Sequence, residues 1–137
     1  MNSLEEDENL RLDFEKVKKA LLKYENIIPV IVQDVKTLQV LILAYVNETA
    51  LQKSLSSGVA TFWSTSRNEL WIKGATSGQY LDIREVRVNC EQNSLLFLVE
   101  IREEGACHTK NSVGKHRYSC YYRYIEDGKL KFVKGLK

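Results

Sequence analysis

Apolar and polar positions repeat with two different periods along this chain. Near the N-terminus, spacings of four and three residues place an apolar stripe on a predicted helix that ends before Pro29: Leu10, Phe14, Val17, Leu21 and Tyr24. The following runs, "IIPVIVQD" and "LQVLILAYV", are rich in β-branched residues and predict two strands joined around residues 34–37. Asn47 and Gly58 then bound a second predicted helix as its N-cap and its terminating glycine.

Three predicted hairpins account for most of the remaining chain. "VATFWS" and "ELWIK" flank the turn "SRN", strands at about 80–90 and 94–102 meet at "EQNS", and "IEDGKL" reverses through Asp127 and Gly128. No internal repeat, linker or low-complexity segment interrupts this order. The pattern predicts an α+β fold of mostly antiparallel strands with two main helices.

Composition narrows the class of protein. A chain of 137 residues suffices for one domain, and 44% hydrophobic and 28% charged residues are ordinary globular values. No apolar run approaches the roughly 18–20 residues of a membrane-spanning helix, and the acidic N-terminus lacks the pattern of a secretory signal. We therefore expect a cytoplasmic protein without a membrane partner. The net charge of +2 calls for no nucleic-acid partner.

Two of the three cysteines and both histidines lie within residues 105–123, a basic stretch without an acidic residue. An odd cysteine count without a signal peptide argues against a disulfide framework. Cationic surroundings favour the thiolate form of Cys107 and Cys120. Cys90 shares a predicted strand face with Val86 and Val88 and, taken alone, is typical of a buried structural thiol.

The number of cysteines is more informative than their spacing, which matches no closed zinc motif. Three thiolates fill three corners of a tetrahedral zinc site and leave the fourth to water, an arrangement typical of catalytic zinc that indicates a hydrolase. His108 directly follows one proposed ligand and is a candidate general base, although a surface histidine would look the same in the sequence. We expect His116 to be a loop residue.

Six blocks of sequence, in order, resemble the phosphoribosyl-AMP cyclohydrolase family of histidine biosynthesis: "PVIVQD", "AYVNETAL", "FWSTSRNELWIKGATSG", "NCEQNSLLFLV", "ACHT" and "SCYYR". The resemblance spans residues 27–124 and implies a barrel-like sheet in an intertwined homodimer. It divides the chain into an N-terminal helical extension, residues 1–26, and a cyclohydrolase domain, residues 27–137, in a single domain overall.

The resemblance also implies the chemistry. Zinc is held by three cysteines, one from the partner subunit of the homodimer, at positions that match Cys90, Cys107 and Cys120. Water activated by zinc, with His108 as base, attacks C6 of the adenine ring of phosphoribosyl-AMP, and the N1–C6 bond breaks. Candidate substrate-binding residues are Trp63, Arg67, Lys73, Thr76, Ser77, Gly78 and Thr109. By themselves, Trp63 is more typical of a core position than of a base-stacking one, and Arg67 and Lys73 could equally be solvated.

Two departures from the family pattern bear on the metal and the pocket. Where the family has D-C-D-x-D, assigned to magnesium, this chain has Asn89, Glu91 and Asn93 around Cys90. Because magnesium binds through carboxylate and water oxygens, two neutral amides predict a weakened magnesium site, and the same residues suit a hairpin turn. The segment "KNSVGKHRY" also lengthens the spacing between the last two cysteines and could add a phosphate contact through Lys110, Lys115 or Arg117.

Two other functions stay open at the level of sequence. A divergent paralogue acting on another purine nucleotide would account for the lost aspartates and the longer loop. A non-catalytic, zinc-stapled module could bind a nucleotide or RNA through the basic residues 105–123. Turnover of phosphoribosyl-AMP at a normal rate would exclude the paralogue, whereas unfolding on metal removal and salt-dependent binding to nucleic acid would indicate the zinc-stapled module.

Overall fold

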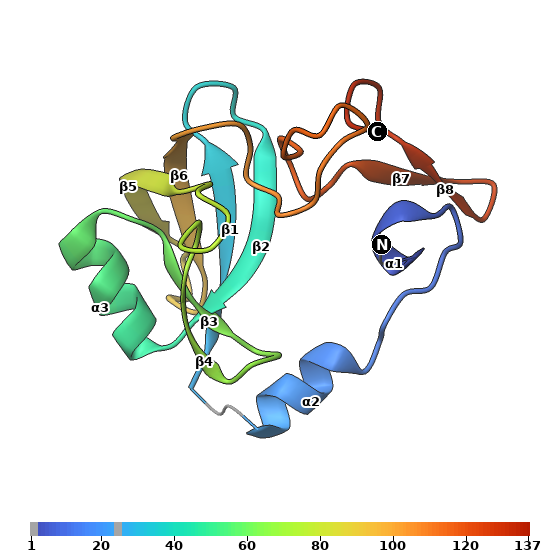
Figure 1. Cartoon of the computed structure of the whole chain (residues 1–137). Coiled ribbons are helices and arrows are strands. Elements are labelled where there is room, and N and C mark those ends of the chain that lie inside the picture. The colour runs from blue at the N-terminus through green and yellow to red at the C-terminus, as the bar shows by residue number, and fades with distance from the viewer. Residues whose placement is uncertain (1–2, 24–25) are drawn as a thin grey trace.

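The computed structural model describes residues 3–23 and 26–137. Its central sheet consists of β1 (Ile28–Asp34), β2 (Val40–Val46), β5 (Leu81–Val88) and β6 (Leu95–Ile101). The strand order is β2-β1-β6-β5 (Figure 1). β1 pairs with β6 in parallel, whereas β1–β2 and β5–β6 are antiparallel, so the sheet is mixed.

Two hairpins and one well-capped helix complete the part beyond residue 26. The hairpins are β3 (Thr61–Ser64) with β4 (Glu69–Ile72), and β7 (Arg123–Glu126) with β8 (Lys129–Phe132). Helix α3 (Glu48–Ser57) begins where the Asn47 side chain accepts a hydrogen bond from the Ala50 amide, and it ends at Gly58 with φ of 74°. The α+β class, the three hairpins and the two ends of this helix are confirmed.

The main core lies between the sheet, α3 and the β3–β4 hairpin. Phe62 of β3 stacks on Phe97 of β6 with ring centroids 6.1 Å apart, and both are fully buried. Val30 and Val32 of β1 lie beside them in the same cluster. Alternate residues of the central strands supply this core, as the period of two in the sequence requires.

The barrel-like sheet predicted from the resemblance is wrong. The β3–β4 and β7–β8 hairpins each form a separate two-stranded sheet beside the four-stranded one. No closed barrel forms among residues 3–23 and 26–137. A barrel needs a continuous ladder around its whole circumference. In the described residues, an isolated bridge between Val59 and Asp82 joins the chain before β3 to β5.

The predicted N-terminal helix is also longer than the observed one. The structure has α1 (Ser3–Glu6) and α2 (Lys16–Lys23), making three helices in the described residues rather than two. Asp13 Oδ1 accepts hydrogen bonds from the amides of Glu15 and Lys16, so it caps α2 and prevents the helix from starting at residue 10. Ala20 is the buried residue of α2, whereas Phe14 and Leu22 are exposed. Tyr24 lies outside the described residues.

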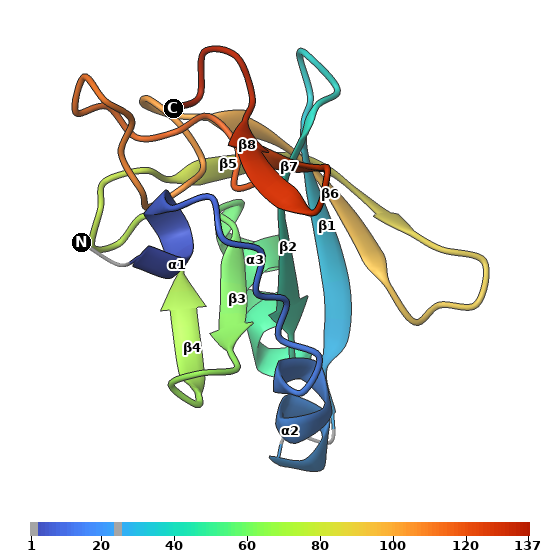
Figure 2. The same cartoon turned by 90° about the vertical axis from the view of Figure 1, so that its right-hand side faces the viewer.

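The two ends of the chain lie close together. Figures 1 and 2 both show α1 beside the β7–β8 hairpin, with the chain then running away to α2. In Figure 2 the turn between β5 and β6 projects beyond the rest of the sheet, far from α1. None of the helices in the described part of the chain is both long enough and apolar enough to span a membrane.

Candidate functional site

The thiols of Cys107 and Cys120 meet in the segment that leads to the β7–β8 hairpin. They lie close enough for each to shift the pKa of the other, and the Thr109 hydroxyl lies 3.0 Å from the Cys107 sulfur. Cys107 is buried with 2% of its surface exposed, whereas Cys120 is exposed. The pair is therefore closed on the side of Cys107 and open on the side of Cys120.

The proximity of the two sulfurs shifts their pKa values in opposite directions. The interaction with Cys120 lowers the pKa of Cys107, against burial, which acts to raise it. The same interaction raises the pKa of Cys120. One thiol of the pair is therefore more acidic than a free cysteine.

Backbone hydrogen bonds fix Cys107. Its amide donates to the Arg117 carbonyl at 3.0 Å, and the Arg117 amide donates to the Thr109 carbonyl, also at 3.0 Å. The chain approaches so closely here that a Cβ on Gly105 would lie 2.3 Å from the Arg117 carbonyl oxygen. Glycine is required at position 105 for this steric reason.

Cys120 is fixed from the opposite side, by the central sheet. Its amide donates to the Leu41 carbonyl of β2 at 2.8 Å, and the Ser119 hydroxyl donates to the Val40 carbonyl at 2.9 Å. The Tyr118 hydroxyl donates to buried Asp34 at 2.6 Å. Edge strand β2 thus positions one thiol, and a loop-to-loop contact positions the other.

Lys73 brings a buried positive charge to the two thiols. Its side chain is buried at the end of the β3–β4 hairpin, with the ammonium 5.9 Å from the centroid of the Trp71 ring. Burial lowers the pKa of Lys73, and the charges of Cys120 and Cys107 act to raise it. This proximity to sulfur places Lys73 at the thiols rather than at a solvated strand position.

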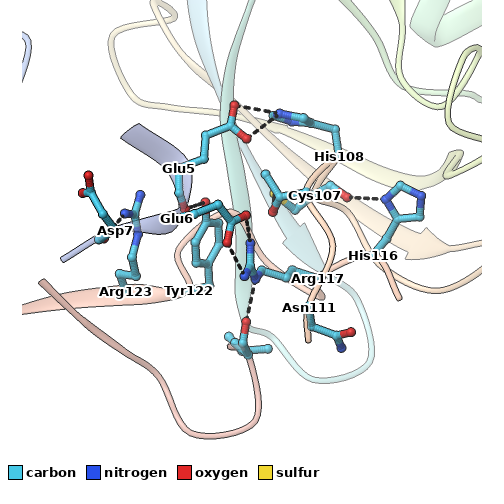
Figure 3. Close-up of polar contacts among 12 residues, drawn as sticks. Glu5, Glu6, Asp7, Cys107, His108, Asn111, His116, Arg117, Tyr122 and Arg123 are labelled. Carbon is cyan, nitrogen blue, oxygen red and sulfur yellow. Dashed lines mark hydrogen bonds and ion pairs between the residues drawn. The ribbon is translucent and has the colours of Figure 1, made fainter. Parts of the chain in front are cut away.

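Both histidines lie around the thiol pair, in different roles (Figure 3). His108 is exposed, and its Nε2 lies 3.2 Å from a carboxylate oxygen of Glu5. His116 Nδ1 lies 3.1 Å from the Cys107 carbonyl, and its amide donates to Glu104 at 2.8 Å. His116 therefore supports the backbone of the loop, as expected for a loop residue.

A hollow of about 460 Å³ opens beside Cys120. Residues of α2, β2 and the β3–β4 hairpin line it, and its aromatic walls are Tyr45, Trp63, Trp71 and Tyr121. Trp63 is half-buried, and Trp71 packs on the core residue Phe62, with ring centroids 5.7 Å apart. An apolar, aromatic hollow that adjoins a soft metal ligand suits a flat heteroaromatic ring.

The small-residue loop after β4 is attached to the Cys107 segment. Gln79 is buried, and its side-chain oxygen accepts hydrogen bonds from the amides of Glu104 at 2.8 Å and Gly105 at 3.2 Å. Thr76 and Gly78 in this loop are exposed, and Ser77 is half-buried. Arg67 lies apart in the β3–β4 turn, where its Nε is 3.5 Å from Glu69.

Cys90 lies elsewhere, in the exposed turn between β5 and β6. The Asn89 side-chain oxygen accepts hydrogen bonds from the amides of Asn93 and Ser94, each at 2.9 Å, so Asn89 closes the turn. Glu91 is exposed. Within residues 3–23 and 26–137 no group of three histidine, cysteine, aspartate or glutamate side chains could hold a metal ion. One chain thus brings together two of the three proposed ligands.

Three residues of this region were not identified from the sequence: Glu5, Glu6 and Gln79. The opposite charges of residues 1–15 and 105–123 were a usable signal for the first two, because oppositely charged segments attract. Gln79 left no such signal, since its role depends on a tertiary contact 25 residues away in sequence.

The donor set of the thiol pair fits zinc. Zinc binds thiolate sulfur readily, and the interaction with Cys120 lowers the pKa of Cys107, which favours its thiolate form. Two sulfurs fill half of a tetrahedral site, and Cys120 is accessible from outside the chain. The exposed thiol of Cys90 has the correct chemistry for a third ligand.

Comparisons with known proteins agree on one family. Residues 42–122, more than half of the chain, match the family model for phosphoribosyl-AMP cyclohydrolase. The chain is similar to the phosphoribosyl-AMP cyclohydrolase of Archaeoglobus fulgidus, with 47% identity over 107 residues that cover 78% of this chain and 93% of that protein. For the Hyphomonas neptunium enzyme of the same name, identity is 48% over 78% of this chain and 76% of that protein.

The match also extends to a larger protein. The histidine biosynthesis bifunctional protein HisIE of Aquifex aeolicus is 41% identical over 78% of this chain but only 49% of its own length. This chain therefore resembles one part of that bifunctional protein.

Proposed function

Because the chain belongs to the phosphoribosyl-AMP cyclohydrolase family, we propose that it hydrolyses the adenine ring of phosphoribosyl-AMP in histidine biosynthesis, cleaving the N1–C6 bond with the help of zinc. The observation that carries the proposal is the pair of neighbouring thiols, Cys107 and Cys120, of which the first is buried and the second is accessible from outside the chain. It lies beside an aromatic hollow.

Cys107 and Cys120 of one subunit would hold the zinc together with Cys90 of the partner subunit. When bound, zinc supplies a Lewis acid that lowers the pKa of a water molecule in its fourth position. Three thiolates on a dication leave a net charge near −1, estimated from formal charges. The buried ammonium of Lys73 offsets that charge from beside the two sulfurs.

The hollow beside Cys120 would bind the substrate base. Trp63 and Trp71 offer ring faces for the purine, and Thr109 lies against the Cys107 sulfur, where it could orient the base edge. The loop with Thr76, Ser77 and Gly78 offers hydroxyls and backbone amides to phosphate, and Arg67 offers a guanidinium. These contacts hold the ring carbon near the nucleophile, which is the main entropic contribution to catalysis.

His108 would accept the proton of the attacking water. Its Nε2 faces Glu5 at 3.2 Å, so the carboxylate stabilises the imidazolium that proton transfer produces. Breaking the N1–C6 bond requires a proton at the ring nitrogen, and the same imidazolium would return it. Addition to C6 is then followed by collapse of the tetrahedral centre toward the opened ring.

A homodimer accounts for the separation of Cys90 from the other two cysteines. Cys90 lies on a projecting hairpin and is exposed, which is what a ligand for a neighbouring subunit requires (Figure 2). Apolar side chains on the outer face of β1 and β2 are exposed as well, at Ile31, Val40 and Leu43. A twofold dimer would bury such a face, and its symmetry would make each contact of the hairpin with the partner occur twice.

Magnesium would have a minor role at most. The side-chain oxygen of Asn89 already accepts two backbone hydrogen bonds, and Glu91 is the carboxylate that stands among the three positions around Cys90. A hard divalent ion requires several oxygen ligands. Ring opening should therefore proceed with zinc alone.

Turnover of phosphoribosyl-AMP by the purified full-length protein tests the proposal, with zinc supplied and magnesium varied. The expected result is ring opening that is lost on zinc chelation and regained on zinc addition. Full activity in the chelated protein would contradict the zinc requirement. A zinc-bound dimer that leaves phosphoribosyl-AMP intact but opens another purine nucleotide would favour a divergent paralogue.

A further inference from the structure

Residues 3–8 precede the part of the chain that matches the family model, yet they pack against the candidate site (Figure 3). Tyr122 donates its hydroxyl, Arg123 its guanidinium and Leu130 its amide to this segment, over 2.8–3.0 Å. The acceptors are backbone carbonyl oxygens of Leu4, Glu5, Asp7 and Glu8. These contacts depend on backbone geometry and leave the acidic side chains available for other partners.

Glu6 uses its side chain on Arg117. Both carboxylate oxygens accept from the guanidinium, at 2.9 Å and 3.0 Å. The Arg117 side chain is only 2% exposed, and its Nε donates to the Leu136 carbonyl at 2.7 Å. The Tyr122 ring lies 4.3 Å from the guanidinium carbon. A guanidinium this buried needs a counter-charge, and Glu6 supplies a two-pronged one.

The backbone of Arg117 in turn fixes the thiol site. Its carbonyl accepts from Cys107 and its amide donates to Thr109, so residues 107 and 109 are both tied to residue 117. Cys107 and Thr109 carry the sulfur and the hydroxyl that lie 3.0 Å apart. The position of Arg117 therefore determines the position of a proposed zinc ligand.

We propose that Glu6 is a positioning residue for the thiol site: through Arg117 it holds the 107–117 backbone contact in the geometry that binds zinc. The inference rests on the proposed function for the identity of the metal. Without the Glu6 charge, the buried guanidinium has no counter-charge, and moving it toward water lowers its free energy. Its backbone contacts with Cys107 and Thr109 then weaken, and the zinc ligand loses its fixed orientation.

The test compares Glu6→Gln with Glu8→Gln in the full-length protein. Both remove one negative charge from the same segment, but Glu8 is exposed and contacts Leu130 through its backbone carbonyl. Hydrogen exchange of the Cys107 and Arg117 amides is measured in the metal-free protein, and zinc affinity by competition with a chelator. Glu6→Gln should speed amide exchange and weaken zinc binding about tenfold, which is typical when a residue that supports a metal ligand is substituted. Glu8→Gln should match the wild type.

Unchanged exchange and zinc affinity in Glu6→Gln, or equal losses in both variants, would overturn the proposal. Faster exchange with unchanged zinc affinity would also overturn it, because the contact would then stabilise the fold alone. A wild-type protein that binds no zinc would instead contradict the zinc requirement of the proposed function. The two failures are therefore distinguishable.

Discussion

Cys107 and Cys90 are the same kind of residue in opposite surroundings. Cys107 is buried, lies beside a second thiol and is tied through Arg117 to the N-terminal segment. Cys90 is exposed in a hairpin turn that projects from the sheet (Figure 2). The first environment lowers the pKa of its thiol, whereas the second leaves the thiol accessible to another molecule. A metal site assembled from both kinds of environment couples zinc binding to dimer formation.

The largest effect on turnover should come from substituting the exposed cysteine in one variant and the buried cysteine in another. Cys90→Ser and Cys107→Ser should each lower turnover by more than about a hundredfold. Even substitution of a residue that only hydrogen-bonds to a metal ligand lowers metal affinity or activity about 10- to 100-fold. Mixing the two variants should restore about a quarter of wild-type activity, because random pairing makes half of the dimers mixed, each with one intact site. Turnover after subunit exchange measures this.

A second mixture serves as the control. Cys107→Ser and Cys120→Ser alter the same half of the site, so no pairing of these subunits regenerates an intact set of three thiols. Activity should stay low in this mixture. Equal recovery in both mixtures, or none when Cys90→Ser meets Cys107→Ser in proven mixed dimers, would contradict a shared site.

A smaller but still substantial loss of stability should follow from overpacking the buried segment around Cys107. Gly105→Ala places a Cβ 2.3 Å from the Arg117 carbonyl and should lower the free energy of unfolding by about 3 kcal/mol, as overpacking does. Gly114→Ala is the matched control, because its Cβ meets nothing within 4 Å. Its positive φ of 83° alone should cost about 1–2 kcal/mol. Urea denaturation compares the two, and equal losses would contradict the steric argument.

The contact between Tyr118 and Asp34 should give a pH-dependent effect of intermediate size. Burial acts to raise the pKa of Asp34, but hydrogen bonds from Tyr118, Lys36 and Thr37 outweigh it and the net shift is downward. Tyr118→Phe removes one of these donors and should cost about 1–2 kcal/mol at neutral pH. Thr37 also contacts the Tyr118 hydroxyl, so the variant tests the whole contact.

The sign of the pH dependence follows from the lowered pKa. The stabilisation from ionised Asp34 is complete well above its ordinary pKa of 3.8 and is lost as the pH falls through the lower folded value. The difference between the wild type and Tyr118→Phe should therefore be largest near neutral pH and shrink below pH 3.8. Denaturant titrations across this range measure it. A difference that grows in acid would contradict the assignment.

Local signals were readable in the sequence, and long-range ones were not. Asn47 and the Asp127–Gly128 turn act on neighbouring residues, so their chemistry predicted the ends of α3 and the last hairpin. The parallel pairing of β1 with β6 joins strands separated by five other elements, and alternation along a strand says nothing of its neighbour.

The same limit applies to the candidate site. The residue types around Cys107 and the resemblance of "ACHT" identified that region, because motif and chemistry coincide within a few residues. The Glu6–Arg117 pair spans 111 residues, and only the opposite charges of the two segments were visible beforehand. Phe14 and Leu21 illustrate the converse, since a regular apolar stripe predicted a packed helix, yet both side chains are exposed.

The smallest effect should come from loosening the exposed half of the site. The Asn89 side-chain oxygen closes the β5–β6 turn through the amides of Asn93 and Ser94, so Asn89→Ala should cost about 1 kcal/mol. Asn89→Asp keeps an acceptor and should stay within about 0.5 kcal/mol of the wild type. Under the proposed function, this turn supplies Cys90 to the partner's site, so Asn89→Ala should also weaken zinc binding in the dimer more than urea denaturation alone indicates. If it lowers stability while zinc affinity is unchanged, the hairpin is only a closed turn, and the contrast between the two cysteine environments loses its functional meaning.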